Sequence, residues 1–112
     1  MNGFADSTNI AYISDHGENL GARGLWDKSV MYEEPVGVPM LLAGLDVPED
    51  KVVKTPVSLA DVFPTILDGV DVDVPDNLPC NSLFDTAAAE DDNERIIFSE
   101  YHGAAVTSGA FM

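Results

Sequence analysis

The stretch that decides the fold is Asn9-Ile10-Ala11-Tyr12-Ile13-Ser14-Asp15-His16-Gly17-Glu18. Its first part is short, apolar and rich in residues that favour extended structure, and it predicts a buried strand. Gly17 and Gly21 then frame a polar stretch that marks a loop. An Asp and a His therefore stand side by side where the strand ends. Because ligands in an open α/β sheet bind outside the carboxyl ends of the strands, this pair is the first candidate site.

Two further elements follow this loop. Residues 25–34 predict a turn or two of helix, and Pro35 is expected to close it. Residues 38–43 form a second apolar run and predict another strand. Pro39 near the start of this run fits the first residue of a strand or a sheet edge.

The middle of the chain predicts a capped helix over residues 59–67. Ser58 is placed to cap its N-terminus, and Asp61 occupies the position of a capping box. Pro64 falls within the helical pattern and is expected to break or kink the helix.

The last third of the chain continues the alternation. It predicts a short helix over residues 82–89, a strand over residues 95–101 and the start of another strand at residues 109–112. Strands that alternate with helical patterns indicate an α/β fold. The pattern begins and ends in the middle of elements, so we expect the chain to be part of a larger domain.

Composition narrows the class of function. The chain has 112 residues, 46% of them hydrophobic, which suits a folded domain with one core. It contains no apolar run long enough to cross a membrane, and its start does not resemble a signal peptide. The net charge of −15 makes nucleic acid and anionic membranes poor partners, because both are bound through Lys and Arg. A single cysteine, Cys80, rules out an intrachain disulfide and leaves the compartment open.

The Asp15-His16 pair has a chemistry of its own. A carboxylate oxygen and an imidazole nitrogen at one strand end are able to hold a divalent cation, and Gly17 permits the tight turn that would bring both to one point. The alternative is a loop carboxylate that accepts hydrogen bonds beside a surface histidine. The residues alone leave both interpretations open.

Short motifs follow one another in a distinctive order. They are Ser14-Asp15-His16-Gly17-Glu18, Leu20-Gly21, Gly24-Leu25 before Lys28, Tyr32-Glu33-Glu34, Val38-Pro39-Met40, Asp61-Val62-Phe63-Pro64-Thr65-Ile66-Leu67, Glu100-Tyr101-His102 and Gly109-Ala110-Phe111-Met112. In this order they resemble the type I sulfatase family of the alkaline phosphatase superfamily. The resemblance spans nearly the whole chain. It implies a partial alkaline-phosphatase-like sandwich with a mixed, largely parallel sheet flanked by helices, and it makes residues 1–112 a fragment of a catalytic domain that lacks the N-terminal nucleophile segment.

The resemblance also implies roles for individual residues. Asp15 and His16 match metal ligands of the family, where the cation is usually Ca²⁺, with Mn²⁺ in related phosphonate ester hydrolases. A nitrogen ligand is unusual for Ca²⁺, so the chemistry alone would not select it. Lys28 matches a lysine that contacts a sulfate oxygen, which gives it a catalytic and substrate-binding role. Arg23 stands where many members carry a histidine; it supplies a fixed positive charge but no general acid near neutral pH. His102 is expected to line the substrate pocket, or to be a hydrogen-bonded structural histidine.

The activity that the resemblance implies is hydrolysis of a small-molecule sulfate ester by a metal-dependent enzyme. The family's nucleophile is a formylglycine made from a Cys or Ser in a Cys/Ser-x-Pro-Ser/Ala-x-Arg motif, and nothing in this chain matches that motif. Cys80 lacks the downstream Pro and Arg and is expected to be a small packed residue. The formylglycine is therefore expected in a missing N-terminal part, and the isolated chain is expected to be inactive. The alternatives are a phosphate or phosphonate ester hydrolase of the same superfamily, or a non-catalytic acidic module that binds metal.

Overall fold

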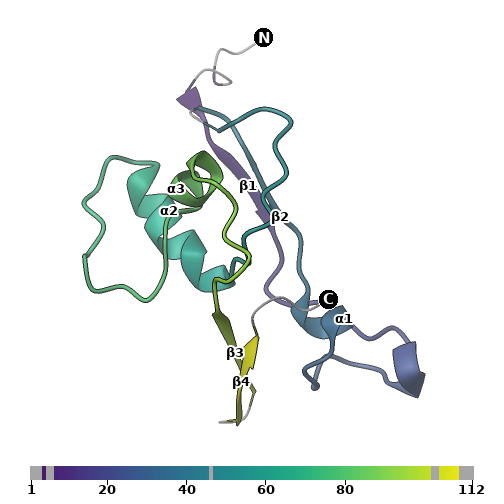
Figure 1. The fold of residues 1–112 in the computed structure, drawn as a ribbon. Coiled ribbons are helices and arrows are strands. Elements are labelled where there is room, and N and C mark those ends of the chain that lie inside the picture. The colour runs from purple at the N-terminus through teal and green to yellow at the C-terminus, as the bar shows by residue number, and fades with distance from the viewer. Residues whose placement is uncertain (1–3, 5–6, 46, 102–103, 109–112) are drawn as a thin grey trace.

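The computed structural model describes residues 4, 7–45, 47–101 and 104–108 (Figure 1). In chain order its elements are β1 (Ile10–Ile13), η2 (Ala22–Gly24), α1 (Glu33–Val36), β2 (Met40–Ala43), η3 (Leu59–Asp61), α2 (Val62–Asp68), α3 (Leu83–Ala88), β3 (Ile97–Tyr101) and β4 (Ala104–Ser108). The α/β class is confirmed, and the predicted strands at residues 9–14, 38–43 and 95–101 are all present. Strand β4 is not predicted by the sequence, and the strand expected at 109–112 lies outside the described residues. No helix in the described part of the chain is long and apolar enough to span a membrane.

The strands form two separate antiparallel pairs. In the first, β1 pairs with β2 in a register that sets Ile10 opposite Ala43 and Ile13 opposite Met40. In the second, β3 pairs with β4, with Ile97 opposite Ser108. The prediction of a largely parallel sheet therefore finds no support among the strands that the structure describes. Alternation of strands and helices indicates the fold class, but it does not encode the direction in which neighbouring strands run.

Strand β1 is exposed, and the prediction that it is buried is wrong. All four of its residues lie at the surface, with Tyr12 63% exposed. The physical reason is that its sheet has only two strands, so one edge of β1 has no partner in the described residues. In β2, half-buried and exposed residues alternate, which is the pattern of a strand covered on one face.

The two helices α2 and α3 pack against each other beside the first sheet (Figure 1). The predicted cap at Ser58 is confirmed: its hydroxyl accepts from the Ala60 N–H, and Asp61 accepts from the Ser58 N–H at 2.8 Å. The helix starts with the 3₁₀ turn η3 and continues as α2. Ser82 caps α3 in the same way by accepting from the N–H of Phe84 at 3.2 Å.

Pro35, expected to close a helix, and Pro64, expected to break or kink one, both lie inside helical segments and end neither of them. Pro35 lies inside the single turn of α1 rather than after a helix over residues 25–34, and Pro64 lies inside α2. Both prolines occupy the first turn of an α-helical segment. A proline there removes only an N–H that has no partner within the helix, so it is tolerated.

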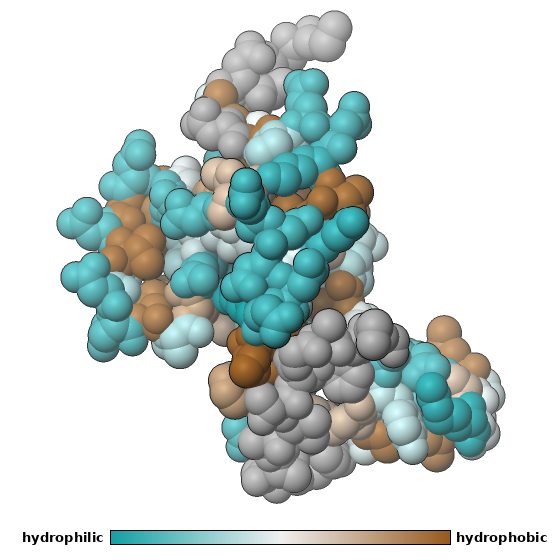
Figure 2. Space-filling view, viewed as in Figure 1, coloured by the Kyte–Doolittle hydropathy of each residue, from teal (hydrophilic) through white to brown (hydrophobic). Residues whose placement is uncertain are grey.

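Few apolar side chains are buried. Among the described residues the buried apolar side chains are Leu83, Pro35 and Pro64, whereas the buried polar ones are Asn19, Thr55, Asp61, Thr65 and Ser82. The accessible surface is 8337 Å², against about 6000 Å² for a compact monomer of this mass. The Cα radius of gyration is 15.8 Å, against about 13 Å for a compact domain of this length. Apolar side chains consequently appear at several places on the surface in Figure 2.

Candidate functional site

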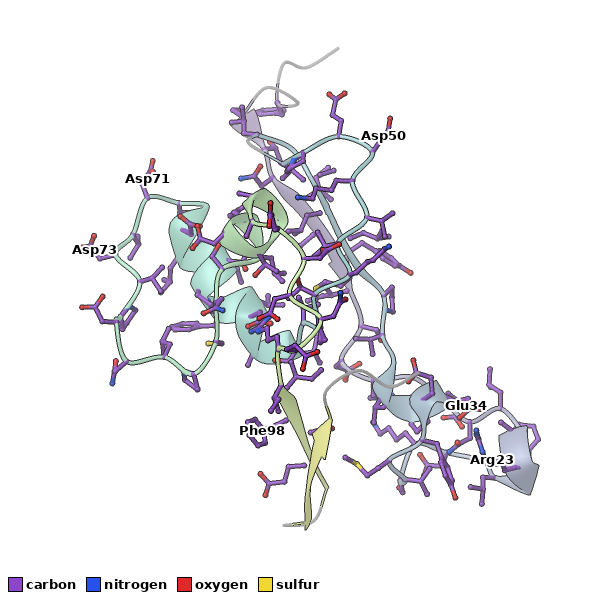
Figure 3. All side chains as sticks on the ribbon, viewed as in Figure 1. Arg23, Glu34, Asp50, Asp71, Asp73 and Phe98 are labelled. Atoms are coloured by element: carbon purple, nitrogen blue, oxygen red, sulfur yellow. The ribbon has the colours of Figure 1, made fainter. Side chains whose placement is uncertain are left out.

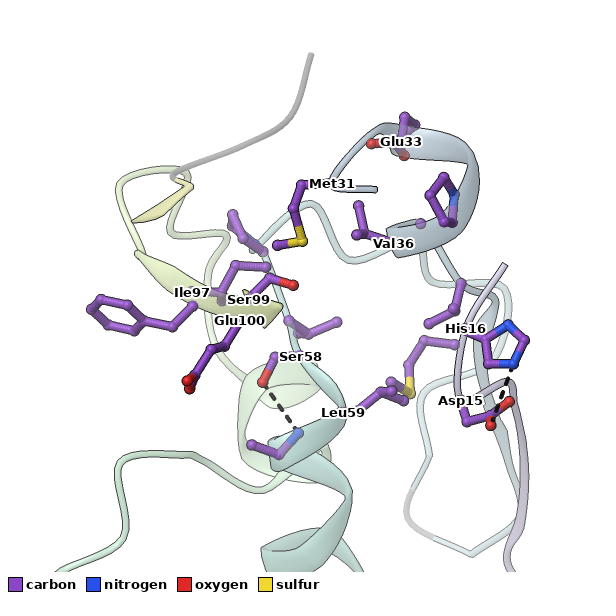
Figure 4. Close-up of a pocket in the computed structure, with 18 of the residues that line it drawn as sticks. Asp15, His16, Met31, Glu33, Val36, Ser58, Leu59, Ile97, Ser99 and Glu100 are labelled. Atoms are coloured by element: carbon purple, nitrogen blue, oxygen red, sulfur yellow. Dashed lines mark hydrogen bonds and ion pairs between the residues drawn. The ribbon is translucent and has the colours of Figure 1, made fainter. Parts of the chain in front are cut away.

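The turn that follows β1 places the side chain of His16. The Ser14 hydroxyl donates to the His16 carbonyl at 2.8 Å and tightens the turn. His16 Nδ1 lies 2.7 Å from the Gly17 carbonyl oxygen. Since a carbonyl only accepts, Nδ1 carries a proton, and in the neutral ring Nε2 then presents a lone pair. Asp15 Oδ2 lies 3.7 Å from this Nε2 (Figure 4).

Gly17 holds this turn against α1. Its N–H donates to the Pro35 carbonyl at 2.8 Å. A Cβ atom on Gly17 would lie 1.9 Å from the backbone oxygen of Glu34, so no other residue fits without movement of the backbone. The glycine is needed here for close approach of two backbones.

Lys28 comes to the same point from the far side of the loop. Its Nζ contacts His16 Nε2, and its backbone N–H donates to Asp27 Oδ1 at 2.6 Å. The structure thus brings together three residues that the sequence singles out: Asp15, His16 and Lys28. The ammonium group contacts the imidazole of His16, and Asp15 lies next to the same imidazole nitrogen.

These three residues line one cleft of about 650 Å³. Its walls come from the loop and α1, the N-terminal end of η3 and strand β3 (Figure 4). Met31 and Val36 face it from one side, and Ser99 from the other. A second lysine, Lys54, also lines it. The cleft therefore combines apolar walls with two lysines and with the carboxylates of Asp15, Glu33 and Glu100, so it offers charges of both signs to a ligand.

The Asp15-His16 geometry fits two ligands on one divalent cation. Cation–oxygen bonds of about 2.3–2.6 Å to Ca²⁺ are compatible with a ligand separation of 3.7 Å. A metal-binding histidine usually donates its other ring N–H to a carbonyl or carboxylate, as Nδ1 does here. In the described part of the chain no group of three or more His, Cys, Asp or Glu side chains gathers at one point. The pair thus offers part of a coordination shell.

Arg23 lies outside this cleft. Its Nη1 donates to both carboxylate oxygens of Glu34, and its Cζ lies 4.5 Å from the centre of the Tyr32 ring (Figure 3). The hydrogen bond with Arg23 holds the pKa of Glu34 below its usual range, and the same bond raises the pKa of Arg23. The guanidinium charge is matched by Glu34, so the catalytic role expected for Arg23 stays a prediction.

Two other residues complete the comparison with the sequence. His102 lies outside the described residues, so its expected place in the substrate pocket also stays a prediction. Cys80 is half-buried and unpaired among the described residues. Sequence reasoning missed Asn19, which the structure buries beneath the loop. A lone asparagine in a polar loop carries no periodic signal that would single it out.

Comparison with known proteins gives a line of evidence that does not depend on the geometry of the cleft. The family model described as Sulfatase matches residues 1–72. Arylsulfatase K of Bos taurus is 33% identical over 118 residues, which covers 98% of this chain and 22% of the relative. Arylsulfatase K of Mus musculus is 34% identical over 113 residues, covering 94% of this chain and 20% of the relative. A solved structure of a candidate sulfatase from Bacteroides thetaiotaomicron matches 86% of this chain and 22% of its own, with a TM-score of 0.66 and 26% identity. The chain spans about a fifth of the length of these proteins.

Proposed function

The chain belongs to the sulfatase family, and from this premise we propose that it carries one part of an active site that hydrolyses a small-molecule sulfate ester. The observation that carries the proposal is the convergence of Asp15, His16 and Lys28 on one cleft. The matching positions lie within residues 1–72, where the family match is found.

In this proposal the pair Asp15 and His16 and the side chain of Lys28 have different roles. A divalent cation, Ca²⁺ or Mn²⁺, displaces the Lys28 ammonium from Nε2 of His16 and is held by this nitrogen and by the Asp15 carboxylate. When bound, such a cation supplies positive charge that stabilises the sulfate oxygens. Lys28 supplies a second positive charge on a flexible stem, which binds a sulfate oxygen and neutralises charge that grows during hydrolysis.

The chain on its own lacks a complete site in this proposal. Residues 1–112 are a fragment of a sulfatase catalytic domain, and the formylglycine nucleophile and the remaining metal ligands come from residues beyond this segment. Cys80 does not stand in a nucleophile motif and does not line the cleft. The isolated chain therefore binds a cation weakly and shows no turnover.

Paramagnetic Mn²⁺ tests the metal half of the proposal even when binding is weak. Added below stoichiometric amounts, Mn²⁺ is expected to broaden the NMR signals of Asp15 and His16 first, and excess Ca²⁺ should restore them. Asp15→Asn should abolish this selectivity. The matched control is Asp73→Asn, which makes the same charge change at an exposed residue between α2 and α3. Equal broadening in both variants would show only diffuse attraction to an acidic surface, and would sink the site.

Activity assays and the upstream DNA sequence test the proposal that the rest of the active site comes from residues outside this segment. The purified chain should leave an aryl sulfate and an aryl phosphate unhydrolysed in the presence of Ca²⁺ or Mn²⁺. DNA sequence upstream of the codon for Met1 should contain an in-frame Cys/Ser-x-Pro-Ser/Ala-x-Arg motif. Turnover of the aryl sulfate by the chain alone would contradict the division of the site. A different nucleophile motif upstream would move the assignment to phosphate or phosphonate esters.

A further inference from the structure

Asn19 is the one buried side chain between residues 7 and 34, a stretch that the structure describes throughout. It is 3% exposed, whereas Leu20 and Trp26 in the loop that follows are each 74% exposed. A buried amide inside an otherwise exposed loop calls for a specific interaction, because burial of a polar group is unfavourable unless it is hydrogen-bonded.

The interaction is a double hydrogen bond to one carbonyl. The backbone N–H of Asn19 donates to the Asp27 oxygen at 3.3 Å, and the side-chain Nδ2 donates to the same oxygen. Asn19 Oδ1 has no hydrogen-bond partner. The amide nitrogen thus makes a hydrogen bond while the amide oxygen makes none, so the contact at this position depends on a donor.

The carbonyl that accepts both hydrogen bonds from Asn19 belongs to Asp27, the residue immediately before Lys28. Asp27 has a φ of 71°, a left-handed conformation that is uncommon outside glycine and that aspartate tolerates better than most residues. Its carboxylate accepts from the Lys28 N–H at 2.6 Å. Two hydrogen bonds on one side and one on the other fix the turn from which the Lys28 side chain departs toward His16.

We propose that Asn19 is a positioning residue that holds Lys28 against His16. The hydrogen bonds between Asn19 and Asp27 join the two ends of the loop. His16 and Lys28 lie just outside this junction, one on the chain segment that enters the loop and one on the segment that leaves it. These hydrogen bonds therefore set the distance between the imidazole and the ammonium. The inference rests on the proposed function in so far as Lys28 serves that reaction.

An NMR measurement on the chain tests this without any turnover. The ¹⁵N signal of His16 Nε2 reports whether an ammonium donates to its lone pair, and Lys28→Met gives the value without that donor. The measurement is made at about pH 8.5, where an ordinary imidazole is neutral and an ordinary lysine is charged. Asn19→Asp keeps the shape of the side chain but replaces the donor by a carboxylate. We expect it to move the His16 signal by nearly the full difference between wild type and Lys28→Met.

The control is Asn93→Asp, which makes the same change at an exposed turn and should leave the His16 signal at its wild-type value. A wild-type His16 signal in Asn19→Asp would overturn the proposal. If that variant disturbs the whole loop, Asn19→Ser decides, since its hydroxyl falls one bond short of the carbonyl and should give the Lys28→Met value. Loss of all loop signals in both variants, with those of α2 and α3 intact, would also overturn it, because Asn19 would then support the loop as a whole.

The two proposals fail separately. If Asn19 positions Lys28 but no sulfatase motif is found upstream, the His16 signal still moves and only the reaction is wrong. If the motif is present but the signal stays, the reaction stands and another contact places Lys28. In an enzyme that contains this segment, Asn19→Asp and Lys28→Met should lower kcat/KM by similar factors, and the double variant should be no worse than Lys28→Met alone.

Discussion

Asp61 and Arg95 form an ion pair inside the molecule, with Arg95 Nη2 2.7 Å from Asp61 Oδ1. The Asp61 side chain has no exposed surface, and that of Arg95 is 16% exposed. The same carboxylate accepts from the backbone N–H groups of Ser58 at 2.8 Å and Asn81 at 3.0 Å. One side chain thereby joins the start of η3, the segment before α3 and the approach to β3. Since β3 lines the cleft opposite His16, this junction also fixes one wall of the candidate site.

Removal of Arg95 should destabilise the chain strongly. Arg95→Met leaves the Asp61 carboxylate buried without its counter-ion, which costs about 3–5 kcal/mol in comparable buried pairs. Urea unfolding at neutral pH, followed by circular dichroism, measures the change. Arg23→Met is the control, because its ion pair with Glu34 is partly exposed and should change the midpoint little. Similar midpoints for the two variants would show that the buried pair does not stabilise the fold.

Thr65 should matter for a different reason. Its hydroxyl donates to the Asp61 carbonyl at 2.6 Å and accepts from the Leu83 N–H at 2.8 Å. Thr65→Val keeps the volume but leaves a buried N–H unpaired, which should lower the free energy of unfolding by about 1–3 kcal/mol. Thr86→Val makes the same change where the hydroxyl only adds a bond to the Ser82 carbonyl, which the Thr86 N–H also contacts. The effect of the control should be clearly smaller in the same urea experiment.

Gly17 should be irreplaceable for the metal-binding geometry. In Gly17→Ala the new methyl group overlaps the Glu34 carbonyl, so the turn must move and carry Asp15 and His16 with it. We expect the selective broadening by Mn²⁺ to disappear. Gly24→Ala is the matched control: with φ of +73° and nothing within 4 Å of the added carbon, it carries only backbone strain of about 1–2 kcal/mol. Retained broadening in Gly17→Ala would contradict the proposed ligand geometry.

The Arg23 and Glu34 pair should respond to acid and salt. Its hydrogen bond lowers the pKa of Glu34, so its contribution to stability is complete above the ordinary glutamate pKa of about 4.3. That contribution is lost as the pH falls through the lowered value. A ¹³C titration of the Glu34 carboxyl should show a higher midpoint in Arg23→Gln than in wild type, with a smaller difference at about 0.5 M NaCl. Identical midpoints would mean that the pair does not form in solution.

Local features could be predicted from the sequence where a short pattern determines them. Ser58 with Asp61 three residues later specifies a capping box, and the structure contains it. The β-prone run before Asp15 specifies a strand, and the Asp-His pair follows its end as expected. The convergence of Lys28 on His16 was accessible only through the ordered motifs of the family, because no local pattern relates two residues across a loop.

Other features depend on contacts between distant segments. The direction of strand pairing, the exposure of β1 and the hydrogen bonds of Asn19 with Asp27 are all of this kind. Pro64 shows a related limit: the helix begins at the expected cap, but its first turn is 3₁₀, so the proline falls in the first turn of the α-helical part α2. The ion-pair partner of Arg23 likewise could not be predicted, because Glu34 lies on a different element, α1.

The exposed apolar side chains make the solubility of the chain depend on its excess of acidic residues. Side chains such as Tyr12, Leu41 and Phe98 are each more than 60% exposed, and the edge of β1 away from β2 has no partner in the described residues. Molecules of this kind attract one another when they collide. A net charge of −15 keeps them apart by mutual repulsion. With an isoelectric point near 4.1, that repulsion disappears on acidification, and the chain that stays dispersed at neutral pH should precipitate as the solution reaches this pH.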